Sequence, residues 1–370
     1  MAALFFAFDF LPFAVGIFVL TAAPLGFWLG WSRVRRRQVS EAEQTARNPG
    51  PPGSYAFLGF CLEKMPDWFN RAGLRYGAWL ATVLMPRQRA ASREYLRVIL
   101  GRAPGQREIW QHFHAFAEYL FLRLEIAHGR APRLRPAPGE DDRALRELAA
   151  SGRPALYGTM HVGHSDLLGY FLGDLGAKVH MIRKRVGNSA DTERLAQRYG
   201  ANVTYLWINS WADRVFAMNA ALRAGRSLAM QCDRFEYSAK REPFHFLNAT
   251  RQMPFTIYHV AIMHGLPAAF AFAVPAAHDP GASEILVPPI FEPRADWSRE
   301  ENLQAARAHF QAVLDKVEAL LRLRPFLWFN FTPLNPVVAS SQPAASTLLP
   351  ASSCAPRRDV LEVPSGAPAP

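Results

Sequence analysis

The chain contains 370 residues, of which half are hydrophobic and a fifth are charged. That composition excludes a disordered polyelectrolyte, and the length suffices for one large core or two smaller ones. Lys and Arg together number 42 against 31 Asp and Glu, so the net charge of +11 favours anionic partners. The three cysteines, Cys61, Cys232 and Cys354, are spaced neither like a zinc knuckle nor like a disulfide framework.

The N-terminal region contains a long apolar run. From Phe10 to Trp31 the 22 residues carry no charge, which is close to the roughly 20 that a helix needs to cross hydrocarbon. Four arginines follow within 33–37 and no Lys or Arg precedes the run, so the positive-inside rule places the rest of the chain in the cytoplasm. We expect a transmembrane anchor with a basic flank over 1–38. The alternative is a hairpin of two short helices, broken near Pro24, that lies in one leaflet.

Composition divides the remainder of the chain into parts. The sequence NPGPPG at 48–53 breaks any helix, so a folded region is expected to begin at Ser54. Residues 54–150 show helical periods whose Arg-rich polar faces suit either an anionic lipid surface or water. One of the apolar faces contains Trp68, Ala72, Tyr76 and Trp79. The final segment, 335–370, is rich in Pro, Ala and Ser and is expected to be a disordered tail after a globular region over 54–334.

Beyond residue 150 the pattern changes to short β-rich runs separated by helical periods. The runs are ALYGTMH (155–161), KVHMI (178–182), NVTYLWI (202–208), SLAMQCD (227–233) and PAAFAFAV (267–274). Their alternation with helices predicts an α/β fold over 151–334, with a mostly parallel central sheet flanked by helices. A long helix is expected over 299–323 and an aromatic strand, PFLWFNF, over 325–331. In such sheets, functional side chains gather at the carboxyl ends of the strands.

The first β-rich run ends in GTMHVGHSD, which offers a candidate general base. The four-residue spacer between His161 and Asp166 can bring the carboxylate beside the imidazole ring. A carboxylate on one ring nitrogen fixes the tautomer and leaves the other nitrogen to take a proton from a hydroxyl. The alternative is structural, with Ser165 as a helix cap, Asp166 as a first-turn acid and His161 as a core histidine.

Motifs of several other enzyme classes are absent from the sequence. There is no Gly-x-Ser-x-Gly elbow, no Gly-rich phosphate loop and no Gly-x-Gly-x-x-Gly fingerprint, which disfavours covalent serine chemistry and nucleotide chemistry. Cys232 lies beside Asp233, which disfavours its thiolate, so we expect a buried structural thiol. His161, His164 and Asp166 lack an obvious further ligand for a metal. We therefore expect no metal and no cofactor.

Basic side chains recur at the ends of later elements. Arg183 follows the second β-rich run, Arg198 lies near the end of the next helix, and Arg251 lies in FLNATRQMPF. Converging guanidinium groups would hold a phosphate or a developing oxyanion, whereas each alone is more often a surface charge. Asp233, at the carboxyl end of its run, is either an ion-paired structural acid or a site residue.

The chain resembles the bacterial lipid A biosynthesis (lauroyl/myristoyl) acyltransferases, within the glycerolipid acyltransferase superfamily. The segments that carry the resemblance occur in the order GTMHVGHSD, MIRKRVGN, LAQRYG, LAMQCDRF and EPFHFLNATRQMPF, within about 68–331. The resemblance implies that His161 and Asp166 form a catalytic dyad. It implies substrate-binding roles for Arg183, Arg198, Asp233 and Arg251. Many members have Glu in place of Asp166, and their Asp-x-Asp is here Gln231-Cys232-Asp233.

The resemblance implies a membrane-anchored acyltransferase of the bacterial inner membrane whose catalytic domain faces the cytoplasm. An acyl chain would move from acyl carrier protein or acyl-CoA to a hydroxyl of a lipid acceptor, a lipid A precursor, by general-base catalysis without an acyl-enzyme. The donor, the acceptor lipid and the membrane are the expected partners, and no nucleic acid is. Trp328, Phe329 and Phe331 would line an acyl groove, rest at the membrane interface or form sheet core.

Other functions remain open at this point. A lysophospholipid or an aminolipid could replace the lipid A precursor as acceptor. The altered Gln231-Cys232-Asp233 block also fits a catalytically inactive lipid-binding homologue, and His161, His164 and Asp166 leave a metal hydrolase as a third class.

Overall fold

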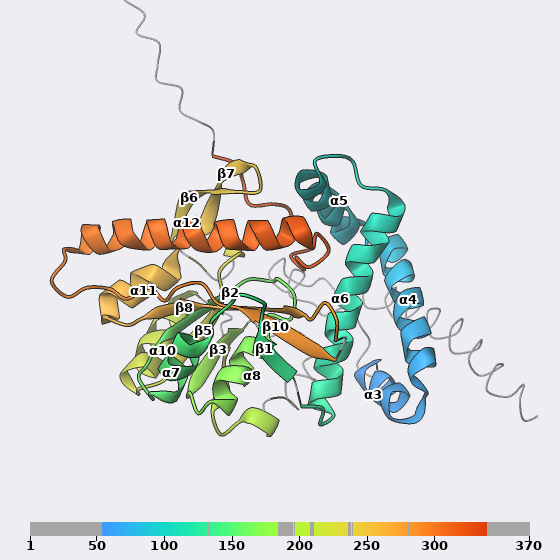
Figure 1. Ribbon diagram of the computed structural model, residues 1–370, viewed down its shortest axis with the longest axis horizontal. Coiled ribbons are helices and arrows are strands. Elements are labelled where there is room, and N and C mark those ends of the chain that lie inside the picture. Colours follow the sequence, from blue (N-terminus) through green and yellow to red (C-terminus); the bar gives the residue numbers. More distant parts are fainter. Residues whose placement is uncertain are drawn as a thin grey trace, which may run out of the picture. The chain divides into compact units, whose positions relative to one another are not determined.

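The computed structural model describes residues 54–131, 133–183, 195, 197–207, 211–235, 238, 240–279 and 281–338 (Figure 1). The predicted anchor over 1–38 and the tail from 339 onward lie outside these residues. Within them, no helix combines the length and the apolar character needed to cross a membrane. The first residues assigned to the tail are described, and the backbone N–H of Gln252 donates to the carbonyl of Pro336 at 3.1 Å.

The central sheet contains five parallel strands in the spatial order β4-β3-β5-β2-β8. The strands are β2 (Leu156–Thr159), β3 (Val179–Arg183), β4 (Val203–Trp207), β5 (Ser227–Gln231) and β8 (Ala268–Phe270). Neighbouring side chains of β2 enter different buried clusters, Leu156 on one face and Tyr157 on the other. Because both faces are apolar, both must be covered by helices. The predicted parallel α/β sheet flanked by helices is confirmed.

Helices cover the two faces of this sheet in two groups. The cluster around Tyr157 takes side chains from α7 (Arg143–Ala150) and α8 (Leu167–Asp174). The cluster around Leu156 takes side chains from α10 (Trp211–Arg223), α11 (Thr256–His264) and α12 (Arg299–Leu323). The bounds of α12 agree with the predicted helix. In Figure 1, α12 runs between α11 and the hairpin of β6 (Arg241–Phe246) and β7 (Ala249–Pro254), and it contacts both α11 and β6.

The residues before the sheet form a helical region. Its elements are α3 (Ser54–Lys64), α4 (Asp67–Leu84), α5 (Pro86–Leu100) and α6 (Gln106–Ala127). α6 contacts both α4 and α5, and α4 and α6 lie side by side (Figure 1). Tyr95 and Phe113 from this region lie in the same buried cluster as Leu156 of the sheet. The helical region and the α/β region therefore share one hydrophobic core.

Two smaller β elements complete the described part. β1 (Arg133–Pro136), β10 (Ala282–Leu286) and β9 (Phe272–Pro275) form a sheet in that order. β6 (Arg241–Phe246) and β7 (Ala249–Pro254) form an antiparallel hairpin. The hairpin turns through Leu247 and Asn248, whose φ angles of 52° and 59° are positive. A two-residue hairpin loop of type I′ requires this left-handed backbone at both positions, and Asn adopts it more readily than most residues.

Two predicted strands differ from the structure. The aromatic segment 325–331 is not a strand, because its only β pairing is an isolated bridge between Trp328 and Val162. Its backbone instead binds the loop after β2, where the N–H of Phe329 donates to the carbonyl of His161 at 2.6 Å. The predicted strand 267–274 is two strands, because β8 pairs with β2 and β9 pairs with β10.

Candidate active site

The carboxyl ends of β2 and β5 place two functional side chains side by side. The strands are parallel neighbours in the sheet, with Thr159 opposite Gln231 at their ends. The backbone N–H of Cys232 donates to the carbonyl of Thr159 at 2.7 Å, which continues the pairing by one step. Two residues beyond Thr159 the chain reaches His161, and two beyond Gln231 it reaches Asp233. The sheet register thus brings together residues that lie 72 positions apart.

Asp233 holds both the backbone and the ring of His161. One carboxylate oxygen, Oδ1, lies 2.8 Å from Nδ1 of the imidazole, and the other, Oδ2, accepts the backbone N–H of His161 at 3.0 Å. Because an ionised carboxylate only accepts hydrogen bonds, Nδ1 must carry the proton. Nε2 then has the lone pair and is the basic nitrogen of the ring.

The segment after α12 also binds Asp233 and the loop that carries His161. The indole Nε1 of Trp328 donates to Oδ2 of Asp233 at 2.9 Å. The carbonyl of Leu327 accepts from Gly163 at 2.7 Å, so backbone bonds flank the loop that carries His161. The side chain of Asp233 is fully buried and Trp328 is 2% exposed. A buried carboxylate with three donors cannot rotate without leaving polar groups unpaired, so the imidazole has a fixed orientation.

Burial and neighbouring charge set the protonation states of the pair. Burial raises the pKa of Asp233, but the imidazole and the hydrogen bonds from His161 and Trp328 outweigh it and lower the pKa to about 2. Burial is also the largest influence on His161, and together with the guanidinium of Arg234 it lowers the pKa below 6.5 despite the opposing effect of Asp233. At neutral pH the pair is therefore a carboxylate and a neutral imidazole.

The Nε2 atom of His161 is the reactive end of this arrangement. The side chain is 15% exposed, in contrast to the fully buried side chain of Asp233. Within the part of the chain that the structure describes, no hydrogen bond engages Nε2. A neutral imidazole with a fixed tautomer and an accessible Nε2 can accept a proton from a hydroxyl or a water that approaches it.

The predicted contact between His161 and Asp166 is corrected by this geometry. Asp166 instead forms ion pairs with two arginines, at 2.6 Å between its Oδ1 and Nη2 of Arg183 and at 3.2 Å between its Oδ2 and Nε of Arg123. Asp166 is the residue immediately before α8, and its carboxylate is taken up by these arginines while Asp233 takes Nδ1 of the imidazole. Burial alone would raise the pKa of Asp166, but the two guanidinium groups hold it well below its usual value.

Arg183, predicted to bind substrate, is occupied by the same cluster. Besides the ion pair with Asp166, its guanidinium carbon lies 5.3 Å from the ring centre of Tyr205. The hydroxyl of Tyr205 in turn lies 2.9 Å from that of Tyr170, a residue of α8. Arg183 therefore joins the end of β3 to the start of α8. A substrate-binding role for it stays a prediction.

The other two predicted arginines bind backbone carbonyls. Nη1 of Arg198 donates to the carbonyls of Ile126, at 2.6 Å, and Arg130, at 3.0 Å, at the C-terminal end of α6. Arg251 is buried, and it donates to the carbonyl of Phe246 at 3.1 Å and to that of Asn335 at 2.8 Å. No contact among the described residues brings either guanidinium to His161.

We expect Arg198→Ala to lower stability. The substitution leaves the two carbonyls at the end of α6 without a cationic donor, at a cost of about 1 to 2 kcal/mol. The measurement is the midpoint of urea unfolding, with Arg223→Ala as the control because Arg223 is an exposed residue at the end of α10. An Arg198→Ala protein that unfolds at the wild-type midpoint would contradict the structural role.

A cavity of about 290 Å³ is lined in part by Arg234, the residue that follows Asp233 in the chain. It is the candidate space for a substrate. It is lined by Arg234, Phe235, Thr332, Pro333, Leu334, Asn335 and Pro336. Nε of Arg234 donates to Oδ1 of Asn330 at 2.8 Å, which fixes the guanidinium at this wall. The lining combines one cation with mostly apolar surface, and it starts at the residue after Asp233. His161 is not part of the lining.

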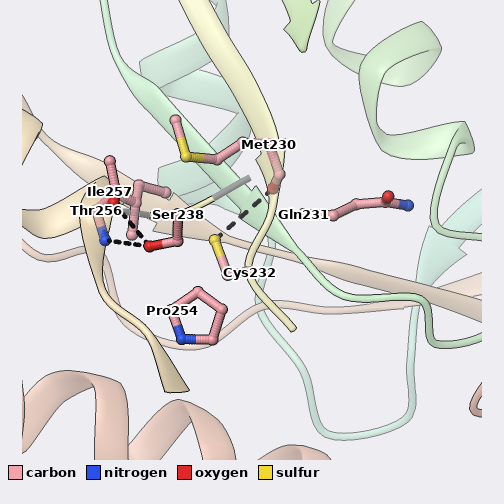
Figure 2. A pocket seen from close by; sticks show the side chains of 7 residues that line it. All are labelled: Met230, Gln231, Cys232, Ser238, Pro254, Thr256 and Ile257. Carbon is pink, nitrogen blue, oxygen red and sulfur yellow. Dashed lines mark hydrogen bonds between the residues drawn. The ribbon is translucent and has the colours of Figure 1, made fainter. Parts of the chain in front are cut away.

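A second recess, on the side of Cys232, has no such capacity. Figure 2 shows Cys232 between Ser238 and Pro254, with Gln231 pointing away from the other side chains that line the recess. The recess has no room for a water molecule. Burial, and then the negative charge of Asp233, raises the pKa of the Cys232 thiol far above its usual value. Cys232 is buried, as expected, and its thiol is inert.

His164 is structural in this arrangement. Its Nδ1 lies 2.7 Å from Oγ of Ser283, and its ring stacks on Tyr119 with 5.9 Å between centres. Burial, assisted by Arg324, lowers its pKa to about 4, so the ring is neutral at physiological pH. Among the residues that the structure describes, no group of three or more His, Cys, Asp or Glu side chains could hold a metal ion.

Two contributors to the site carried no functional signal in the sequence. Arg123 is a helical arginine 43 positions before its partner Asp166, with nothing local to distinguish it from a surface charge. Trp328 was expected in a groove, at an interface or in the core. It lies in the core, yet its indole N–H has a polar role that aromatic patterning does not reveal.

Comparisons with known proteins assign no function to the site. No protein-family model matches the chain, and no curated protein matches its sequence. What the site can do therefore follows from its geometry and from the sequence pattern.

Proposed function

We propose that the protein is an acyltransferase that moves a fatty acyl chain from an acyl thioester to a hydroxyl of a lipid. The observation that carries the proposal is the His161–Asp233 pair, with Nδ1 held by a buried carboxylate and Nε2 accessible at the carboxyl end of parallel strands. General-base activation of a hydroxyl needs this arrangement and no further cofactor. The sequence segments that resemble the lipid A acyltransferases give the substrate class.

The reaction is a direct transfer at the thioester carbonyl. Nε2 of His161 takes the proton of the acceptor hydroxyl as its oxygen bonds to the carbonyl carbon. The carbon–sulfur bond then breaks, and the imidazolium returns the proton to the departing thiolate, so the histidine ends as it began. Asp233 stabilises the imidazolium between these steps, because its carboxylate is already hydrogen-bonded to Nδ1. Binding the acceptor and the donor together beside His161 further accelerates the reaction, because the two reactants no longer have to meet in solution.

Arg234 is the cation that we assign to the anionic part of the substrate. It borders the cavity, follows Asp233 in the chain and donates to the neutral side chain of Asn330. Arg183 is instead paired with the Asp166 carboxylate, and Arg198 and Arg251 bind backbone carbonyls. A guanidinium at the wall of a largely apolar cavity can bind a phosphate or stabilise the oxyanion of the tetrahedral intermediate. The acceptor is accordingly a phosphate-bearing lipid, with a lipid A precursor as the first choice.

The proposal includes the location of the protein at the membrane. The uncharged run 10–31 anchors the chain in the bacterial inner membrane, and the arginines at 33–37 keep the catalytic region in the cytoplasm. Acyl carrier protein and acyl-CoA are both soluble anionic donors on that side. The net charge of +11 favours their approach.

The test is transfer of a labelled acyl chain to lipid in the presence of the full-length protein. Two donors are used, acyl carrier protein and coenzyme A, each carrying a radiolabelled acyl chain. Each donor is offered with lipid A precursor, with lysophospholipid and with aminolipid in separate reactions. The wild type is expected to acylate at least one acceptor, and His161→Ala to acylate none. A wild type that binds these lipids but transfers nothing from any donor would identify a catalytically inactive lipid-binding protein instead.

The pH dependence of the transfer rate follows from the lowered pKa of His161. Below this pKa the ring is protonated and cannot act as a base, so activity rises with pH through it. Because burial and Arg234 lower the pKa, the midpoint of the acid limb of kcat/KM is expected below 6.5. Initial rates between pH 4.5 and 8, corrected for thioester hydrolysis without protein, provide the check. A midpoint well above 6.5 would show that another group limits the reaction.

A further inference from the structure

The outward surface of α3 and α4 is apolar and aromatic. We call it the aromatic face, and it consists of Phe57, Leu58, Phe60, Trp68, Ala72, Tyr76, Trp79 and Val83. Trp68 is 68% exposed, Trp79 is 53% exposed and Val83 is 52% exposed. Single exposed apolar residues are ordinary on a protein surface, but several on two consecutive helices that contact each other, with two tryptophans among them, mark a place where another apolar phase is met.

Helical spacing places the α4 members of the aromatic face on one side of that helix. In α4, the members Trp68, Tyr76, Trp79 and Val83 recur at steps that keep them on one side of the helix. A different side of α4 carries its buried residues, and α4 contacts α6, where the indole of Trp110 donates to the carbonyl of Arg75 at 3.2 Å. The protein core thus takes one side of α4 and leaves the aromatic face without a partner among the described residues.

Charge indicates what covers the aromatic face. Residues 54–100 carry seven basic side chains and three acidic ones. Arg71 and Arg75 are exposed on α4 within a turn of the aromatic face. Aromatic and aliphatic side chains rimmed by arginines match the boundary of an anionic bilayer, where rings sit at headgroup level and guanidinium groups meet phosphate. An apolar protein partner without acidic residues would require no such excess of positive charge.

The chain upstream supports the same occupant. Only residues 32–53 separate α3 from the 22-residue uncharged run 10–31, whose length suits a membrane span. An anchor there would keep α3 and α4 close to the membrane surface, so lipid is within reach of an aromatic face that has no partner among the described residues.

We propose that the aromatic face lies in the interfacial layer of an anionic membrane and sets the orientation of the folded region on it. The inference is independent of the acyl-transfer chemistry, since it requires only binding. Trp68 and Trp79 enter the headgroup and upper acyl region, while Arg71 and Arg75 bind lipid phosphates.

The test places a fluorescent label on the full-length protein by a single cysteine. Cys354→Ser removes the cysteine outside the described residues, and Cys61 and Cys232 are buried. Trp79→Cys carries the label in the aromatic face, and Phe216→Cys, 78% exposed on α10, is the matched control. The probe is a vesicle of phosphatidylglycerol and phosphatidylcholine with bromine on the acyl chains, which quenches only fluorophores that reach them.

We expect strong bromolipid quenching and a blue shift for the label at position 79, and neither for the label at 216. Adding Arg71→Gln and Arg75→Gln should lower the quenching at 79 in these vesicles, with the control unchanged. Equal quenching at both positions, or none at 79, would overturn the inference. A label at 79 that is shielded from aqueous iodide yet not reached by bromolipid would show that residues 1–53 or a second copy of the chain covers the aromatic face instead.

Discussion

Asp233→Asn is expected to reduce acyl transfer by about a thousandfold, close to the loss for His161→Ala. The amide cannot stabilise the imidazolium, and its NH₂ group can donate to Nδ1, which moves the ring proton to Nε2 and removes the basic lone pair. Because the Asp233 side chain is fully buried, water cannot replace the carboxylate. The measurement is the initial rate of acyl transfer at saturating donor, at a pH where the wild type is fully active.

The controls separate this chemical effect from a loss of fold. Trp328→Phe removes one hydrogen bond to Oδ2 of Asp233 but keeps the carboxylate, so its rate should fall far less. Near-ultraviolet circular dichroism reports whether the aromatic core is intact in each variant. A folded Asp233→Asn protein that keeps a third or more of the wild-type rate would refute the role of Asp233.

Asp166→Asn is expected to act mainly on stability, lowering the free energy of unfolding by roughly 3 to 5 kcal/mol. The substitution removes a carboxylate that pairs with both Arg183 and Arg123 in a buried site, because the side chain of Asp166 is only 9% exposed. The carboxylate's stabilisation should be present at neutral pH and lost as the pH falls below 3.8 toward the depressed pKa. Urea unfolding at pH 7 gives the magnitude.

Asp174→Asn provides a matched control at the other end of α8. Asp174 is exposed, so its substitution should change the free energy of unfolding by no more than about 0.5 kcal/mol. At a temperature where the Asp166→Asn protein is folded, the Asp166→Asn protein should retain more transfer activity than the Asp233→Asn protein. If Asp166→Asn were instead as stable as the wild type and inactive, Asp166 would be the catalytic acid that the sequence resemblance implies.

Local signals made some elements predictable in detail. The helix over 299–323 has the expected bounds because its start is encoded by neighbours in the sequence. Ser298 accepts the backbone N–H of Glu301 at 3.2 Å, and the Glu301 carboxylate accepts the backbone N–H of Ser298 at 2.7 Å. The alternation of short apolar runs with helical periods likewise predicted the parallel sheet.

The pairing within the site could not be predicted in the same way. Asp166 is five positions from His161 and was the natural partner on spacing, whereas Asp233 is 72 positions away. Only the neighbouring positions of β2 and β5 in the sheet bring Asp233 to the imidazole, and alternating β and α segments do not encode strand order. The sequence nevertheless marked Asp233 as a candidate site residue, because it lies at the carboxyl end of an apolar β-rich run.

The aromatic face illustrates a different limit. An apolar stripe on α4 predicts a helix with one buried side, and the same stripe fits a protein core or a lipid surface equally well. The structure shows that the buried residues of the helix, Asn70, Ala78 and Thr82, lie outside this stripe. What lies against Trp68 and Trp79 therefore had to be inferred from exposure and charge together.

The most direct measurement of the central claim is the protonation of the two ring nitrogens of His161. Nitrogen-15 spectra of protein labelled at its 11 histidines, with His161→Gln to assign the signal, distinguish a protonated nitrogen from one with a free lone pair. At pH 7.5 we predict that Nδ1 is protonated and Nε2 is not, and that Asp233→Asn abolishes this pattern. A protonated Nε2 in the wild type, or a pattern that Asp166→Asn removes and Asp233→Asn leaves intact, would contradict a base held by Asp233.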